Sequence, residues 1–281
     1  MKDSTFVLGG DLPVYRLGFG AMRLCDPDEW GPPEDRAGAI KVAQRAVELG
    51  VTFIDTADSY GLGANEELLA EALRPYPEGL VIGTKAGQSR PSPDVWQPLG
   101  RPEYLRQQCE LSLRRLKVDR IDLYQLHRID PLVPAADQFG ALKSLQDEGK
   151  IRHIGLSEVT VPQLLAAQEQ IEVVSVQNLY NLADRRHEGV VEYCEREGIA
   201  FIPWLPIAAG AHARPGGPLA AVAAELGATP VQVAIAWLLH RSPVMIPIPG
   251  TKSAAHLEEN LGAGDLELTD EQFQRLDQQL G

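Results

Sequence analysis

The chain has 281 residues, of which 44% are hydrophobic and 23% are charged, and its 26 Lys and Arg against 39 Asp and Glu give a formal net charge of −13. A chain of this length buries roughly three quarters of the surface that its unfolded form exposes, so it needs no disulfide or metal to fold. The negative charge argues against nucleic acids and anionic membranes as partners, because binding phosphates requires clustered Lys and Arg side chains.

Cysteine usage and the lengths of the apolar runs indicate a compartment. The chain has three widely spaced cysteines: Cys25, Cys109 and Cys194. An odd number without a Cys/His cluster indicates reducing surroundings and no zinc site. Lys2 and Asp3 precede no long apolar run, so we expect no signal peptide, and the longest apolar stretch, 199–211, is too short to span a bilayer. We therefore predict a cytoplasmic protein without a metal.

Apolar runs bounded by turn residues predict the strands, taken here in chain order. Residues 6–8 and 14–16 flank Gly9, Gly10 and Asp11, a pattern typical of a hairpin with a glycine turn. Eight strand-like runs follow this hairpin along the chain: 17–19, 52–55, 80–84, 121–126, 151–156, 173–177, 200–204 and 244–246.

Amphipathic stretches between these runs predict the helices. Ile40, Ala43 and Val47 share one helical face. Residues 229–232 form a capping box with Pro at the first helical position, and residues 269–272 form a second one that begins a C-terminal helix. Further helices are expected around residues 68–73, 105–116, 134–148, 160–168, 186–197, 231–239 and 253–260.

Eight strands alternating with helices predict parallel strands joined by right-handed crossovers. In a chain of 281 residues the economical arrangement is a closed (β/α)8 barrel, and no linker divides the chain, so we expect one domain over residues 1–281. The alternative is a doubly wound open sheet, whose GxGxxG fingerprint would follow the first strand. Gly18 and Gly20 fit that fingerprint, but Arg23 occupies its third glycine position, which favours the barrel.

Four polar residues lie where the predicted strands end. Asp55 ends the second barrel strand, Tyr60 lies in the loop after it, Lys85 ends the third strand and His127 ends the fourth. Active residues of such barrels lie at the C-terminal ends of the strands. We therefore expect these four side chains to meet at one mouth of the barrel.

This set of side chains suits proton transfer to an oxygen atom. A tyrosine with a pKa of about 10 is a poor acid, but a nearby ammonium lowers that pKa. Lys85 would supply the ammonium, and Asp55 would keep it charged. Tyr60 would then be a general acid, and His127 would orient a carbonyl oxygen or assist the transfer. No Ser or Cys is paired as a nucleophile, so a hydride from a bound nicotinamide would complete the reaction.

These four positions resemble the catalytic tetrad of the aldo-keto reductase superfamily. Other segments that resemble it are 17–22 (LGFGAM), 55–61 (DTADSYG), 153–157 (HIGLS), 176–181 (VQNLYN) and 248–252 (IPGTK). The bacterial oxidoreductase branch is the most similar, with some likeness to pyridoxal reductases. The resemblance implies that NADPH, with NADH as a second possibility, gives a hydride to an aldehyde or ketone while Tyr60 gives the proton.

The resemblance also implies where the cofactor binds. Ser157 and Gln177 match the positions that hold the nicotinamide carboxamide, and Trp204 matches the position that stacks on the nicotinamide ring. Lys252 and Ser253, at a helix start, match the site of the 2′-phosphate. The other positions expected to contact the cofactor are Gly20, Met22, Asp55, Leu205, Pro206, Ile207, Gly210, His256, Glu259 and Asn260.

Two positions depart from the family pattern. Glu158 stands where the family usually has asparagine, so it can accept a hydrogen bond from the carboxamide but cannot donate one. His256 stands where many members have an arginine, which weakens the phosphate site. NADPH nevertheless remains the expected cofactor. Residues 208–218, rich in Gly, Ala and Pro, are expected to form a strap over the diphosphate.

Two loops are expected to form the substrate pocket over the barrel mouth. Residues 25–34 contain Trp30, and residues 88–100, rich in Pro and Ser, contain Trp96. These tryptophans favour aromatic or flat molecules, so we expect a small-molecule carbonyl substrate for a monomer or weak homo-oligomer. One alternative is a slow-turnover, cofactor-binding regulatory or sensor protein, against which the intact tetrad argues. A metal-dependent hydrolase is a weaker alternative, because its clustered ligands are missing.

Overall fold

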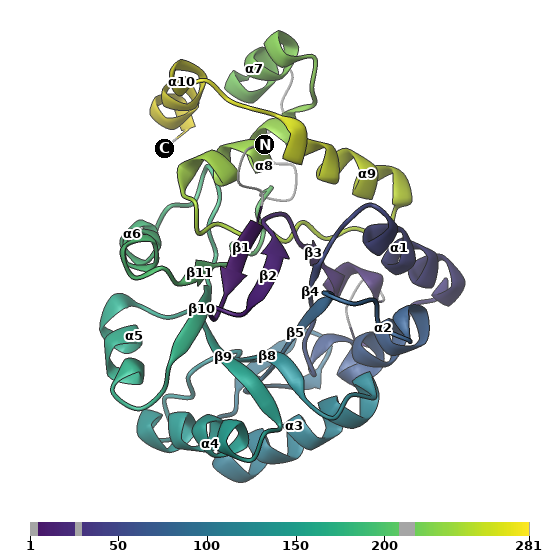
Figure 1. Ribbon diagram of the computed structural model, residues 1–281, viewed down its shortest axis with the longest axis vertical. Helices are drawn as coiled ribbons and strands as arrows, with labels where there is room; N and C mark the ends of the chain where they lie inside the picture. Colours follow the sequence, from purple (N-terminus) through teal and green to yellow (C-terminus); the bar gives the residue numbers. More distant parts are fainter. Residues whose placement is uncertain (1–4, 26–29, 208–216, 281) are drawn as a thin grey trace.

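The computed structural model describes residues 5–25, 30–207 and 217–280. Seven parallel strands lie side by side in chain order and curl into a barrel (Figure 1). They are β3 (Phe19–Gly20), β4 (Phe53–Asp55), β5 (Val81–Ala86), β8 (Ile121–Leu126), β9 (Ile151–Ser157), β10 (Val173–Gln177) and β11 (Ala200–Phe201). Each predicted strand up to residue 204 therefore has its counterpart.

The predicted eighth strand closes the barrel as an extended segment. Ile246 donates a backbone hydrogen bond to the Phe201 carbonyl (2.8 Å), and Gly18 donates one to the Pro247 carbonyl (2.9 Å). The segment thus joins β11 to the chain just before β3. Its pairing is sparse because Pro247 and Pro249 have no N–H to donate. The fold is an α/β barrel of the (β/α)8 type, as predicted, and the open sheet is excluded.

Helices surround the barrel in a ring (Figure 1). The ring consists of α1 (Arg36–Glu48), α2 (Ala64–Leu73), α3 (Pro102–Leu116), α4 (Ala135–Asp147), α5 (Val161–Gln168), α6 (Glu188–Glu197), α8 (Pro230–Arg241) and α9 (Ala254–Gly262). The capping box at Thr229 is present, since its side chain accepts from the Gln232 amide. In the part of the chain that the structure describes, no single helix is long and apolar enough to cross a membrane. The neighbours α7 (Pro218–Leu226) and α8 meet those requirements only jointly, across a bend of 92°.

Two helices pack outside this ring. Helix α10 (Asp270–Leu280) begins at the second predicted capping box, where Thr269 accepts from the Gln272 amide. Helix α7 lies beside it (Figure 1). The sequence reading placed the end of a mobile strap there and missed this helix, although Pro218 at its first position and several alanines favour one. The remainder of that predicted strap, 208–216, lies outside the described residues.

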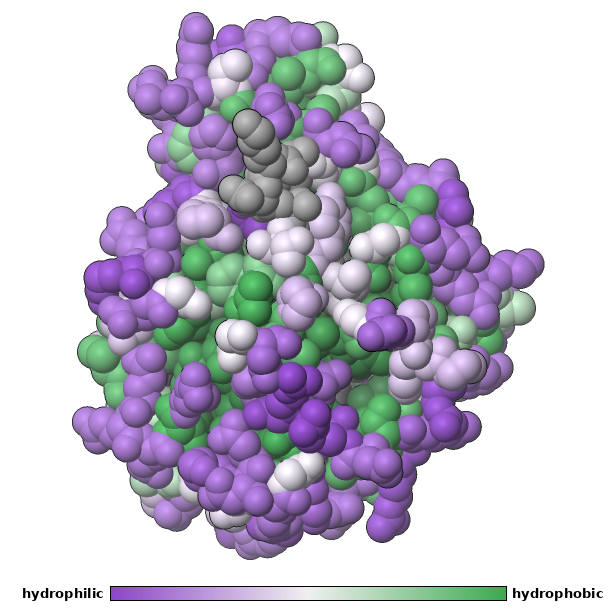
Figure 2. All heavy atoms as spheres, in the orientation of Figure 1, coloured by the Kyte–Doolittle hydropathy of each residue, from purple (hydrophilic) through white to green (hydrophobic). Residues whose placement is uncertain are grey.

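The predicted N-terminal hairpin is present, and it covers the N-terminal end of the barrel. It consists of β1 (Thr5–Leu8) and β2 (Leu12–Tyr15), in front of the barrel in Figure 1. Leu8, Leu12 and Val14 pack on apolar side chains at the N-terminal ends of the strands, including Phe53 and Val81. On this face, hydrophilic side chains line the rim and hydrophobic ones gather toward the centre (Figure 2). The hairpin therefore closes one end of the barrel.

A second hairpin follows β5 at the opposite end. It consists of β6 (Gln88–Ser92) and β7 (Val95–Pro98), paired antiparallel with Ser89 opposite Gln97. The Pro- and Ser-rich segment 88–100 was expected to be a loop, and that expectation was wrong. The two strands are held across the pair by Arg90, whose guanidinium carbon lies 3.7 Å from the centroid of the Trp96 ring. A contact between side chains of two paired strands cannot be predicted from the local pattern of residues.

Candidate active site

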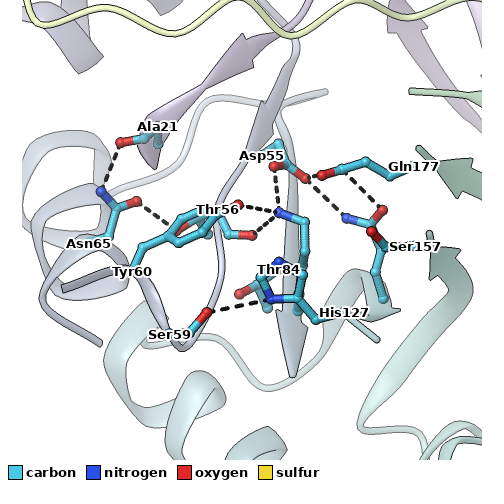
Figure 3. Close-up of polar contacts among 12 residues, drawn as sticks. Ala21, Asp55, Thr56, Ser59, Tyr60, Asn65, Thr84, His127, Ser157 and Gln177 are labelled. Carbon is cyan, nitrogen blue, oxygen red and sulfur yellow. Dashed lines mark hydrogen bonds and ion pairs between the residues drawn. The ribbon is translucent and has the colours of Figure 1, made fainter. Parts of the chain in front are cut away.

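The register of the barrel strands brings the four predicted catalytic residues together. Asp55 is the last residue of β4, Lys85 lies one residue before the end of β5, and His127 follows β8 directly. Tyr60 begins the short helical turn η2 (Tyr60–Gly63) after β4. The side chains of Asp55, Tyr60 and His127 converge from these separate segments (Figure 3). All four residues are at most 6% exposed.

Lys85 is the centre of this group. Its ammonium nitrogen lies 2.6 Å from Asp55 Oδ2, 2.8 Å from the Thr56 carbonyl oxygen and 3.3 Å from the Tyr60 hydroxyl oxygen. An ammonium has three N–H donors, so these contacts use all of them. Because the Tyr60 oxygen accepts from Lys85, the hydroxyl proton of Tyr60 is left to be donated to another group. This is the geometry that a proton donor needs.

The Asp55 carboxylate is held on its other side by two amides. Oδ1 accepts from Gln125 Nε2 (3.0 Å) and from Gln177 Nε2 (2.9 Å). Gln125 reaches it because its neighbour in the sheet is Gly155: a Cβ at that glycine would lie only 2.8 Å from Gln125 Cγ and 2.3 Å from Ser175 Oγ. Sequence reasoning missed Gln125. The signal was available, since it is the one amide side chain of β8 and lies one residue before the end of that strand.

Burial and the charges of Lys85 and Asp55 together set the pKa of Tyr60. Burial opposes the charged form of Lys85, but Asp55 and Tyr60 outweigh it and raise the pKa of the ammonium. Burial raises the pKa of the Tyr60 phenol above its ordinary value, and Lys85 offsets only part of that rise because the Asp55 charge opposes it. The sequence-based expectation of a lowered pKa was therefore wrong. Tyr60 carries its proton at neutral pH, and Lys85 stabilises the phenolate that a proton transfer would leave.

His127 is a neutral imidazole in this setting. Burial, together with the positive charges of Lys85 and Arg128, lowers its pKa well below the ordinary value. Its Nδ1 lies 3.4 Å from the Ser59 hydroxyl oxygen. When Ser59 donates this hydrogen bond, Nε2 carries the ring proton and can donate it to a substrate oxygen.

Aromatic rings form a wall beside the proton donor. The rings of Tyr60, Trp96 and His127 meet edge to face in all three pairs, with centroids 5.9–6.4 Å apart. The Arg90 guanidinium packs over Trp96 and also over Trp30, at 5.6 Å from the Trp30 centroid. Of the two predicted substrate-binding tryptophans, Trp96 is thus in contact with the tetrad, and Trp30 is connected to it through Arg90. Sequence reasoning did not single out Arg90.

Ser157 and Gln177 are adjacent partners at the ends of β9 and β10. Gln177 uses its Nε2 toward Asp55 and Gln125, which leaves its carbonyl oxygen as an acceptor. Ser157 Oγ accepts from Arg128 (3.0 Å), which leaves its hydroxyl proton to be donated. One acceptor beside one donor is complementary to a primary amide. The two residues therefore fit the carboxamide of a nicotinamide.

The chain after β11 carries the next predicted contacts. Trp204 is half-buried, and its indole Nε1 donates to Glu158 Oε1 at 2.7 Å. Leu205 is exposed with a φ of 54°, Pro206 is buried and Ile207 is half-buried. Gly210 lies outside the described residues.

The remaining predicted contacts lie around the start of α9. Lys252 is exposed, and Ser253 caps the helix by accepting from the amide of the exposed His256. The first amides of this helix therefore lie beside a lysine, which fits a phosphate. The neighbouring Gly250 packs against Gly20, where a Cβ would lie 2.7 Å from a carbonyl oxygen. Three more predicted contacts complete the set: Met22 packs near Tyr60, Asn260 is buried and Glu259 is half-buried.

Metal chemistry finds no support at this mouth. Within residues 5–25, 30–207 and 217–280, no group of three or more His, Cys, Asp or Glu side chains could hold a metal ion. Asp55 is bound to an ammonium and two amides, which occupy both of its oxygens. The weaker alternative of a metal-dependent hydrolase therefore has no site among these residues.

A family model described as the aldo/keto reductase family matches residues 16–280. The chain belongs to the aldo/keto reductase family. It is an oxidoreductase, and the resemblance inferred from its motifs is confirmed.

Individual proteins similar to this aldo/keto reductase span nearly all of it. It is 52% identical over 270 residues to a protein of Schizosaccharomyces pombe named an uncharacterized oxidoreductase, covering 96% of this chain and 88% of that one. It is 42% identical over 283 residues to the pyridoxine 4-dehydrogenase of Escherichia coli, covering 99% and 98%. An aldo-keto reductase of Klebsiella pneumoniae, solved in complex with NADPH, has a TM-score of 0.85 at 27% identity, covering 100% and 96%.

Proposed function

We propose that this aldo/keto reductase catalyses the NADPH-dependent reduction of an aldehyde or ketone to an alcohol. The observation that carries the proposal is the contact of the Tyr60 hydroxyl with the Lys85 ammonium, beside a neutral His127 at the barrel mouth. When bound, NADPH supplies the hydride that adds to the carbonyl carbon. Tyr60 donates the proton that the carbonyl oxygen needs.

Each member of the tetrad has a separate role in this proposal. Tyr60 is the general acid, and Lys85 stabilises its phenolate after the transfer. Asp55 keeps Lys85 charged and fixes its position. His127 orients the carbonyl oxygen by donating from Nε2.

In this proposal, residues at the strand ends would hold the cofactor. Ser157 would donate to the oxygen of the nicotinamide carboxamide, and Gln177 would accept from its NH2 group. Trp204 would stack on the nicotinamide ring, and Lys252 with Ser253 would bind the 2′-phosphate. We propose the other positions named from the resemblance as additional contacts: Gly20, Met22, Asp55, Leu205, Pro206, Ile207, Gly210, His256, Glu259 and Asn260.

We propose an aromatic aldehyde of the pyridoxal type as the substrate. Support comes from the 42% identity to a pyridoxine 4-dehydrogenase that the chain covers almost completely. The edge-to-face wall of Trp96 and His127 beside Tyr60 provides a surface against which a flat ring can lie. Trp30 extends that wall through Arg90.

The test is a turnover assay that follows nicotinamide absorbance with NADPH and with NADH. Pyridoxal, substituted benzaldehydes and keto sugars are the carbonyl panel. We expect turnover with NADPH, with pyridoxal-type aldehydes having the highest kcat/KM. Tight retention of nucleotide with no turnover of any carbonyl would instead support the slow-turnover sensor protein.

The proposal also covers the domain organisation, the compartment and the oligomeric state of the protein. We propose one domain over residues 1–281, acting in the cytoplasm as a monomer or weak homo-oligomer on a small-molecule carbonyl. The scarcity of cysteines supports the compartment. Light scattering over a range of concentrations tests the oligomeric state, and a mass that stays above that of a dimer on dilution would contradict it.

A further inference from the structure

Glu158 has an unusual backbone conformation for a glutamate. It follows the last residue of β9 with a φ of 55°, in the left-handed region that L-residues disfavour. Leu205, which follows Trp204, is in the same region with a φ of 54°. The Glu158–Trp204 contact is therefore flanked by two of the four non-glycine residues with positive φ among those that the structure describes. Such conformations persist only where the surroundings hold them in place.

The Glu158 side chain connects three successive strand ends. Its Oε1 accepts from Trp204 Nε1 (2.7 Å), after β11, and from the Leu179 backbone N–H (2.6 Å), after β10. Its other oxygen lies 3.5 Å from His187 Nε2, and the side chain is 22% exposed. Hydrogen bonds to a carboxylate are stronger than those to a neutral acceptor. The indole ring is thus held by its edge.

The Glu158 hydrogen bond engages the indole at Nε1, on the edge of the ring. The backbone N–H of Trp204 also donates to the Asn178 carbonyl (3.2 Å), so the main chain and the ring are each tied to a neighbouring segment. Glu158 Oε1 already accepts two hydrogen bonds, which leaves it poorly placed to accept from a carboxamide as well. The departure from the family's asparagine at this position thus goes with a carboxylate oxygen that is committed to Trp204 and Leu179.

We propose that Glu158 is a positioning residue that fixes the plane of the Trp204 indole, and with it the surface on which the nicotinamide stacks. The second part rests on the proposed function, while the first part concerns the protein without nucleotide. In this chain the carboxylate acts through a neighbouring side chain rather than by touching the cofactor.

The test compares Glu158→Met, which keeps the length of the side chain but removes the acceptor, with Glu158→Gln, which keeps an acceptor without the charge. Trp204 emission is isolated by subtracting the spectrum of the matched Trp204→Phe variant. We expect Glu158→Met to shift Trp204 emission toward that of a solvent-exposed indole and to increase its quenching by acrylamide. Glu158→Gln should retain the native emission. Circular dichroism and thermal melts confirm that the variants are folded.

A double-mutant cycle separates the ring from the Leu179 contact. We expect Glu158→Met to weaken NADPH binding about tenfold in the native background, the loss of about one charged hydrogen bond. In the Trp204→Phe background, which has no indole N–H, the same change should have little further effect. An equal loss in both backgrounds, or native Trp204 emission in Glu158→Met, would overturn the proposal. Because emission is read without nucleotide, this outcome is independent of whether any carbonyl is reduced.

Discussion

The two ends of the barrel are built from the same strands but differ in the chemistry of their buried side chains. At the N-terminal end, Leu8 of the hairpin packs on Phe53, the first residue of β4. At the C-terminal end, the same strand finishes in Asp55, which is bound to Lys85 and two amides. Both ends are buried, yet one is apolar and the other is charged.

The contrast shows where burial stabilises the fold and where it costs. Apolar burial contributes about 25 cal/mol for each Å² removed from water, and it requires no specific partner. A buried charge is costly unless it is paired and hydrogen-bonded, which explains why Lys85 uses all three N–H donors. Substitutions at the hairpin end should therefore change stability, and substitutions at the mouth should change activity.

The largest expected effect is at the mouth. Tyr60→Phe removes the proton donor and leaves the aromatic body, so kcat should fall by about 10²- to 10⁴-fold. NADPH should still quench tryptophan fluorescence with an affinity near that of the native protein. Turnover close to the native rate would remove Tyr60 from the acid role.

The matching change at the hairpin end is Leu8→Ala. Leu8 is fully buried, so the cavity should lower the free energy of unfolding by about 2–5 kcal/mol. Urea denaturation measures this loss, and kcat at a temperature where the variant is folded should remain native. A fall in kcat without a loss of stability would contradict the division between the two ends.

A smaller effect is expected at the rim. Lys252 is exposed at the start of α9, so Lys252→Ala should raise the KM for NADPH by about tenfold and leave that for NADH unchanged. Lys252→Arg keeps the charge and serves as the control. Equal changes for both nucleotides would place the 2′-phosphate elsewhere.

The smallest effect concerns pH. Burial, Lys85 and Arg128 lower the pKa of His127, so below about pH 6.5 the unfolded chain binds a proton there that the folded protein does not. Stability should therefore fall as the pH drops, with His127 contributing about 1 kcal/mol between about pH 6.5 and 5.5. The denaturation midpoint of His127→Gln should depend less steeply on pH in that window. Identical slopes for the two proteins would show that folding leaves the pKa of His127 unchanged.

Much of the fold was predictable because buried strands appear in the sequence as short apolar runs. The strands at 121–126 and 173–177 coincide with their predicted bounds. The hairpin β6–β7 was missed because its stability comes from Arg90 packing on Trp96 across the pair, a contact that prolines in the same segment obscure. Helix α7 was missed because it begins where the Gly-, Ala- and Pro-rich strap expected over 208–218 ends, and no helix was assigned to the residues that follow.

The candidate site was predictable only in outline. Parallel strands end on one side, so the ends of β4, β5 and β8 had to meet. The pKa of Tyr60 is raised because burial and the Asp55 charge outweigh the Lys85 charge. The relative size of these effects depends on the packed structure and cannot be predicted from the residue pattern. The position of Gln125 marked it as a candidate, but its contact with Asp55 depends on its sheet neighbour Gly155. The role of Glu158 depends on which strand end its carboxylate reaches.

The apolar cover at the N-terminal end separates the upkeep of the barrel from its chemistry. Leu8, Leu12 and Val14 pack with the first residues of β4 and β5, at the other ends of those strands from Asp55 and Lys85. Loops after the strand ends can therefore accumulate substitutions that alter ligand choice while the opposite end keeps the barrel folded.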